Sequence, residues 1–240
     1  MKNLQYIKQT HSTNALLWEM IRESHQPEGT AIYTDFQTAG KGQIGNSWES
    51  EARKNLLFSM VLYPLQIPLD RLFLVSQLVS VAIKRSLDKY CDNITVKWPN
   101  DIYRNDKKLA GILIENSLQG NRVKAVVIGV GLNVNQVTFT SDAPNPVSLK
   151  QITGGKPINR KLLLREISHH INNLYNQLDE KKIRLEYAES LYRKVGFHAF
   201  ADESGTFNAR IIEVHPDGQL ELETESGERK SFYFKEVQFK

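Results

Sequence analysis

The sequence predicts an α/β fold, in the broad sense that includes α+β, with a mixed β-sheet, flanking helices and a small all-β unit at the end. In residues 1–190, segments with strand and helix periodicity follow one another without regular alternation. After about Lys194, short strand-like segments are separated by Asp-Gly and Ser-Gly turns, which is typical of a small antiparallel barrel. We therefore expect two domains, residues 1–190 and residues 194–240.

Hydrophobic periodicity places the individual elements. Strands are predicted over residues 31–36, 55–63 and 94–98, and a hairpin over residues 109–116 and 122–128. Helices are predicted over residues 15–21, 69–87 and 161–178. The Ser12-Thr13-Asn14 segment is explained as the cap of the first helix. The buried stripe of the last helix is expected to contain Leu162, Leu163, Ile167, Ile171, Leu174 and Leu178. In the C-terminal unit we expect strands over residues 207–214, 219–225 and 230–234.

The composition is that of a globular protein, with 40% hydrophobic residues, 24% charged residues and a net charge of +4. No apolar run approaches the roughly 20 residues that cross a bilayer, and the first residues lack the apolar stretch of a signal peptide. We therefore expect no membrane partner. The single Cys91 excludes an internal disulfide framework and indicates a reducing cytoplasm.

The segment Val96-Lys97-Trp98-Pro99-Asn100-Asp101 combines a cation, an indole, an amide and a carboxylate. Pro99 restricts the backbone, so Asn100 and Asp101 are expected at the end of a strand. A carboxylate there suits a divalent cation between phosphates. The alternative is an ordinary Asn-Asp turn, which the flanking Lys97 and Lys108 make less favourable.

A glycine-rich loop extends from Gln37 to Trp48 and has glycines at positions 40, 42 and 45. Such a loop can turn backbone N–H groups toward a ligand. Lys41 could reach a phosphate, and Trp48 could stack on a flat base. A flexible surface loop with one buried tryptophan is the alternative. The spacing excludes a Walker A loop.

Two further segments have glycines inside predicted strands. Lys108 enters an apolar strand, which indicates that its ammonium group meets an anion, and Gly111 allows close approach of a ligand. The segment Gly129-Val130-Gly131-Leu132-Asn133 resembles half of a dinucleotide fingerprint, but no helix follows it. A strand exit that presents Asn133 to a ligand and a structural bulge both remain open.

In this order, the motifs Ser12-Thr13-Asn14, Gln37 to Trp48, Lys97 to Asp101, Lys108 to Leu113 and Gly129 to Asn133 resemble the biotin–protein ligase family over nearly the whole chain. The resemblance implies a class II synthetase-like catalytic domain and an SH3-like barrel. It also implies that ATP and Mg²⁺ activate biotin as biotinyl-5′-AMP. A lysine of the biotin carboxyl carrier domain of a carboxylase, such as acetyl-CoA carboxylase, then receives the biotin.

The resemblance also assigns residues. It implies catalytic roles for Lys108, Asp101 and Lys41, with Asp101 either holding Mg²⁺ or deprotonating the acceptor lysine. Biotin would be bound by Ser12, Thr13, Asn14, Gln37, Gly40, Lys41, Gly42, Gln43, Lys108 and Gly111. ATP would be bound by Lys41, Trp48, Asn100, Lys108 and Asn133.

The chain departs from the family pattern in its glycine loop. Gln43 and Ile44 stand where many members have arginine, which is thought to order the loop over the adenylate. We therefore expect faster release of biotinyl-adenylate than from an arginine-bearing relative, measured in a single-turnover chase. Because only residues 1–11 precede Ser12, we also expect a ligase without a DNA-binding repressor domain. A homodimer remains open.

The sequence leaves two rival functions. A lipoate ligase or octanoyltransferase shares the catalytic fold, but the Lys97 to Asp101 segment together with the Trp48 loop favours biotin. A nucleic-acid-binding module would use the C-terminal barrel. The acidic residues of that barrel, among them Glu213 and Glu221, would repel phosphate.

Overall fold

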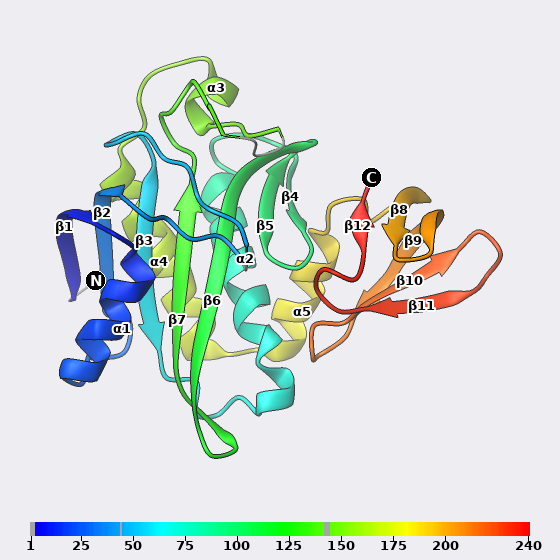
Figure 1. Cartoon of the computed structure of the whole chain (residues 1–240), viewed down its shortest axis with the longest axis horizontal. Helices are drawn as coiled ribbons and strands as arrows, with labels where there is room; N and C mark the ends of the chain where they lie inside the picture. Colours follow the sequence, from blue (N-terminus) through cyan, green and yellow to red (C-terminus); the bar gives the residue numbers. More distant parts are fainter. Residues whose placement is uncertain (1–2, 44, 142–144) are drawn as a thin grey trace.

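The computed structural model describes residues 3–43, 45–141 and 145–240 and contains two β-sheets (Figure 1). The first is a mixed seven-stranded sheet with the order β1-β2-β3-β7-β6-β5-β4. Its strands are β1 (Leu4–Thr10), β2 (Ala31–Gln37), β3 (Leu56–Leu62), β4 (Ile94–Lys97), β5 (Asp101–Arg104), β6 (Lys107–Gln119) and β7 (Arg122–Leu132). The second is an antiparallel sheet of β8 (His198–Asp202), β9 (Gly205–Val214), β10 (Leu220–Thr224), β11 (Arg229–Phe232) and β12 (Gln238–Phe239).

Helices cover both faces of the large sheet. The described helices are α1 (Thr13–Glu23), the short 3₁₀ helix η1 (Leu69–Arg71), α2 (Phe73–Leu87), α3 (Leu149–Thr153), α4 (Arg160–Gln177) and α5 (Glu180–Glu189). Helix α1 packs on β2, β3 and β7, whereas α2 packs on the opposite face and contacts α4 and α5. Every residue of β3 is buried, because this central strand is covered on both sides. No helix in the described part of the chain is long and apolar enough to span a membrane.

Most predicted elements of the large sheet are confirmed, and the differences have local causes. Strand β1 was not predicted, because it lies at the sheet edge and most of its side chains are exposed. The predicted helix over residues 69–87 is divided into η1 and α2. The placement of Leu162 on the buried stripe is wrong. It lies in the first turn of α4 and is 58% exposed, whereas Leu164 is fully buried.

In the C-terminal sheet, the three predicted strands are confirmed as β9, β10 and β11, while β8 and β12 were not predicted. The strand order β11-β10-β9-β8-β12 has two ends. The expected closed barrel is therefore not confirmed among the described residues, because the two-residue β12 pairs with β8 and does not reach β11. This sheet lies beside β4 and α5 (Figure 1).

Candidate active site

A cavity of about 620 Å³ lies over strands β4 to β7, between the glycine loop, the start of α1 and the C-terminal segment. The predicted residues that line it are Ser12, Thr13, Asn14, Gln37, Lys41, Gly42, Gln43, Trp48, Asn100, Asp101, Lys108 and Gly111. Lys41, Asp101 and Lys108 therefore share one cavity. Gly40 and Asn133 are not among the lining residues. Gly40 accepts a backbone hydrogen bond from Trp48, and Asn133 is buried beside Leu109.

Four residues of neighbouring strands form a single row under this cavity. Lys97 pairs with Asp101, Asp101 with Gly111, and Gly111 with Gly131. Paired residues on adjacent strands project from the same face of a sheet. This register row (Lys97, Asp101, Gly111 and Gly131) therefore presents an ammonium group, a carboxylate and then bare backbone to the cavity.

The two glycines of the row leave space that the indole ring of Trp48 fills. A Cβ atom on Gly131 would lie 2.3 Å from Trp48 Cε2, and one on Gly111 would lie 2.9 Å from Trp48 Cζ3. The glycines of β7 are thus explained by close packing. The alternative of a bulge at this point is wrong, because β7 pairs with β3 and β6 without a register shift there. The Trp48 Nε1 atom is buried and has no hydrogen-bond partner among the described residues.

Lys108 lies at the centre of the site. Its Nζ atom donates a hydrogen bond to Asp101 Oδ2 at 2.6 Å and lies 5.8 Å from the centroid of the Trp48 ring. About a quarter of each side chain of the pair is exposed, so both partners are accessible from the cavity. In this structure the anion that this ammonium group meets is Asp101, and a contact with a substrate anion stays a prediction.

The start of α1 provides a second, neutral group of polar atoms. Ser12 occupies the N-cap position, but its side chain makes no capping hydrogen bond, so the explanation of this segment as a helix cap is wrong for the side chain. Instead, Thr13 donates through both its N–H and its hydroxyl group to Gln37 Oε1, at 2.7 and 3.0 Å. Ser59 Oγ lies 2.7 Å from Thr13 Oγ1 and 2.6 Å from Asn14 Oδ1. These polar atoms form a hydrogen-bonded end of the cavity.

Gly129 is the counterpart of Gly131 at this polar end. A Cβ atom on Gly129 would lie 2.2 Å from Asn14 Oδ1, so only a glycine leaves room for this amide. The Asn14 amide also donates to Glu115 Oε2 at 2.8 Å. Neither Ser59 nor Glu115 was predicted. The isolated serine within the apolar β3 was the available signal for Ser59, since a hydroxyl group in a buried strand requires a partner.

The glycine loop is folded back on itself and docked on the sheet. Gly42 N–H donates to Asn46 O and Trp48 N–H donates to Gly40 O, both at 2.9 Å. Gln43 Nε2 donates to Asn100 Oδ1 at 2.7 Å, and Asn100 Nδ2 donates to Ile112 O at the same distance. Gln43 therefore links the loop to the turn after β4. The other departure from the family pattern, Ile44, lies outside the described residues.

The C-terminal segment closes one side of the cavity, which the sequence analysis missed. Phe234, Lys235, Val237, Gln238 and Phe239 all contribute to its lining. The second sheet is held in position by Trp98, whose Nε1 donates to Gly218 O at 2.9 Å. Trp98 is 5% exposed, so it joins the two sheets and does not present a free ring face to a ligand.

The charge of the cavity favours an anion. Among its described lining residues are four lysines, Lys41, Lys97, Lys108 and Lys235, and one carboxylate, Asp101. Burial lowers the pKa of Lys97, with Asp101 opposing this shift and Arg193 and Lys108 adding to it. A single carboxylate, Asp101, fits a magnesium ion whose other ligands come from a phosphate-bearing substrate and from water.

Residues 6–133 match the model of the biotin/lipoate A/B protein ligase family. The chain belongs to this family. It is 32% identical over 222 residues to the bifunctional ligase/repressor BirA of Bacillus subtilis, covering 88% of this chain and 67% of that protein. It is also 32% identical over 180 residues to the biotin–[acetyl-CoA-carboxylase] ligase of Mycobacterium tuberculosis, covering 71% of this chain and 64% of that protein.

Solved structures of biotin–protein ligases share the fold along the full chain. The biotin protein ligase of Aquifex aeolicus in complex with biotin and ATP superposes with a TM-score of 0.80 and 25% identity, covering 100% of this chain and 99% of that one. The predicted resemblance to biotin–protein ligases is confirmed, and so is the mixed α/β architecture. In this member of the biotin/lipoate ligase family, most residues that line the cavity fall inside the matched range, residues 6–133. The C-terminal residues that line it lie outside that range.

Proposed function

We propose that this chain is an ATP-dependent biotin–protein ligase. It activates biotin as biotinyl-5′-AMP and transfers the biotinyl group to a lysine of a biotin carboxyl carrier domain. The observation that carries the proposal is the convergence of Lys41, Lys97 and Lys108 on one cavity that also has a neutral, hydrogen-bonded end. The relative named as a biotin–[acetyl-CoA-carboxylase] ligase supports the same function.

Charge neutralisation is the main chemical requirement of the first step. The biotin carboxylate attacks the α-phosphorus of ATP, an acyl–phosphate bond forms, and pyrophosphate leaves. This attack brings two anions together, so fixed cations lower its barrier. Lys108 exchanges its hydrogen bond to Asp101 for hydrogen bonds to the substrate oxygens. Lys41 approaches the same oxygens from the exposed glycine loop. In the second step the acceptor amine attacks the acyl carbon and AMP leaves.

The polar end of the cavity favours biotin over lipoate. The ureido ring of biotin has a carbonyl group and two N–H groups, which can pair with Thr13, Asn14 and the Gln37 amide. The dithiolane ring of lipoate has no such groups, so it could not form hydrogen bonds with these side chains. A site built to hydrogen-bond a ligand rejects an analogue that lacks the bonding groups, so this network discriminates between the two acids.

Magnesium fits this site as a companion of ATP. Asp101, once Lys108 has released it, would hold the ion together with phosphate oxygens, and the ion would neutralise charge on the phosphates. A role for Asp101 in deprotonating the acceptor lysine requires that Lys108 first releases it. The two roles are separable, because only the first affects adenylation.

The remaining assignments follow from the same function. We propose the carrier domain of a biotin-dependent carboxylase as the protein partner. We also propose a division into a catalytic domain over residues 1–190 and a C-terminal domain over residues 194–240. The single Cys91 supports a reducing, cytoplasmic location.

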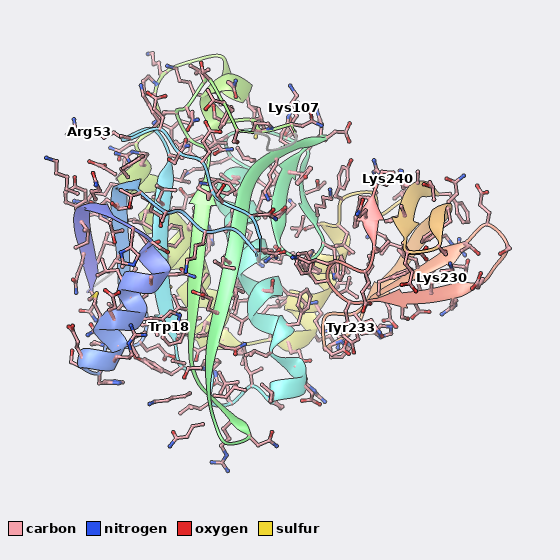
Figure 2. The ribbon with its side chains drawn as sticks, in the orientation of Figure 1. Trp18, Arg53, Lys107, Lys230, Tyr233 and Lys240 are labelled. Atoms are coloured by element: carbon pink, nitrogen blue, oxygen red, sulfur yellow. The ribbon has the colours of Figure 1, made fainter. Side chains whose placement is uncertain are left out.

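The test is ATP–pyrophosphate exchange measured with biotin and with lipoate. We expect exchange with biotin only. Lys108→Ala should lose at least about 100-fold of the exchange rate, because a charge-stabilising group is removed from the reacting centre. Lys107→Ala is the control, since Lys107 is exposed at the outer end of β6 (Figure 2). Exchange with lipoate but not biotin would refute the proposal, and unchanged exchange in Lys108→Ala would remove this residue from the mechanism.

A further inference from the structure

Lys97 is a cavity-lining cation for which the two reaction steps above specify no substrate contact. It is half-buried at the end of β4, and no ion pair between described residues includes it. Asp101, its partner in the register row, is bound instead to Lys108. Removing a positive charge partly from water costs free energy unless an anion pairs with it. Because Lys97 has no carboxylate paired with it, a bound ligand could supply that anion.

Aromatic rings position this ammonium group. Lys97 Nζ lies 5.1 Å from the centroid of the Tyr103 ring in β5 and 5.2 Å from that of Phe239 in β12. It also donates to the Tyr103 hydroxyl group at 3.5 Å. The Tyr192 ring lies against both of these rings, with centroids 5.3 and 6.2 Å away. Rings attract a cation but do not neutralise it, so the charge remains available to the cavity.

The position of Lys97 in the register row suggests which anion it meets. Trp48 covers Gly111 and Gly131 at one end of the row, Asp101 and Lys108 lie in the middle, and Lys97 lies at the other end. Three strand spacings separate Gly131 from Lys97, which is about 14 Å. A nucleotide with its base near Trp48 and its α-phosphate near Lys108 would extend its remaining phosphates toward Lys97.

We infer that Lys97, positioned between the rings of Tyr103 and Phe239, binds the β- and γ-phosphates of ATP and the pyrophosphate released from them. The inference rests on the proposed function and adds to it a substrate contact that depends on the C-terminal strand β12. Pyrophosphate takes no part in the second step, the transfer of the biotinyl group to the acceptor lysine. Lys97 therefore acts in the first half-reaction and not in the second.

The first test separates the substrates kinetically in Lys97→Met. We expect the KM values for pyrophosphate and ATP in the exchange reaction to rise roughly 10- to 100-fold, as for a lost bond to a charged group. The KM for biotin should stay within about twofold, and so should the rate of transfer from supplied biotinyl-adenylate to the carrier domain. Lys97→Arg should retain part of the affinity for pyrophosphate.

Two further variants serve as positioning test and control. Phe239→Leu keeps the charge but removes one ring, so it should raise the KM for pyrophosphate by a smaller factor and leave the KM for biotin unchanged. Lys107→Met removes an exposed lysine outside the cavity and should change neither the KM for pyrophosphate nor the KM for biotin. Thermal unfolding of each variant shows whether it is folded.

A direct binding measurement keeps this inference distinct from the proposed function. Calorimetric titration with magnesium pyrophosphate, without ATP or biotin, should give a clearly weaker Kd for Lys97→Met than for the wild type. Equal Kd values, or equal KM changes for pyrophosphate and biotin, would overturn the inference even if the wild type exchanges pyrophosphate. If the wild type shows no exchange but Lys97→Met still loses pyrophosphate binding, the proposed function fails and the anion site stands.

Discussion

The two glycines of β7 show how single residues determine the site. Gly129 leaves room for the Asn14 amide, and Gly131 leaves room for the Trp48 indole. One glycine thereby forms part of the polar end of the cavity and the other part of its aromatic end. The sequence showed the pair but not its purpose, because Asn14 and Trp48 are far from β7 in the chain and no local pattern indicates which side chains approach it.

Gly131→Ala should displace the Trp48 ring, because a Cβ atom at position 131 would lie 2.3 Å from Trp48 Cε2. We expect kcat/KM for ATP to fall about 100-fold, as for a displacement of the order of 1 Å in a substrate-binding group. Indole fluorescence should change as well. Gly155→Ala is the control, since this glycine meets only the nearby backbone of Thr153. Wild-type kinetics in Gly131→Ala would show that the indole does not support nucleotide binding.

At the scale of elements, α4 is attached to the large sheet through Asp35 of β2. Arg160 at the start of α4 donates to Asp35 Oδ1 at 2.8 Å and to the backbone oxygen of Asn55 at 3.0 Å. Tyr6 of β1 donates to Asp35 Oδ2 at 2.7 Å. Burial alone would raise the pKa of Asp35, but the hydrogen bonds from Tyr6 and Arg160 outweigh it and lower the pKa below its usual value.

Asp35→Asn should lower the free energy of unfolding at pH 7 by about 2 kcal/mol, since it removes the carboxylate of β2 that binds Tyr6 of β1 and Arg160 of α4. The depressed pKa means that the ionised carboxylate stabilises the fold above the unfolded-state value of about 4 and loses this effect as the pH falls through the folded-state value. The difference from the wild type should therefore shrink in urea unfolding experiments between pH 7 and pH 3.5. Asp88→Asn, which removes an exposed i,i+4 ion pair, should change stability by less than about 0.5 kcal/mol. A difference independent of pH would argue against this role of Asp35.

Elements with a strong pattern were predicted, whereas the edge strands β1 and β12 were not. β3 and α2 contain long apolar runs, and their positions follow from burial on the covered faces of the sheet. β1 and β12 lie at the ends of their sheets and depend on pairing with β2 and β8, which their own residues do not reveal. As a result, the cavity wall formed by Phe239 could not be predicted from the sequence.

For the whole molecule, the decisive contact is the one that brings the second sheet to the cavity. The turn at Gly218 accepts a hydrogen bond from Trp98 and packs against the Phe73 ring of α2. Only Pro99 separates Trp98 from Asn100 and Asp101, so the same segment forms part of the site and holds the second sheet. The convergence of Lys41, Asp101 and Lys108 was predicted from family resemblance, but this joint between the sheets was not.

Gly218→Ala should destabilise the protein more than Gly227→Ala. Both glycines have left-handed backbone angles, with φ of +94° and +85°, so both variants incur the same kind of strain. A Cβ atom on Gly218 would also lie 2.7 Å from the Phe73 ring, whereas nothing lies within 4 Å of Gly227. We expect an additional loss of about 1–3 kcal/mol in Gly218→Ala, measured by chemical denaturation. Equal losses in the two variants would mean that the Phe73 contact contributes little.

The register row also determines where the chain can tolerate changes in length. Each of β4, β5, β6 and β7 supplies one member of the row, and side chains alternate between the two faces of a strand. The register of each strand is fixed by its hairpin. Deleting one residue between the hairpin and a member of the row would therefore turn that side chain from the cavity face to the opposite face of the sheet, which helices cover. In a library of single-codon deletions, survivors should therefore be common at the exposed tip around Gly120 and absent from residues 109–113 and 127–132.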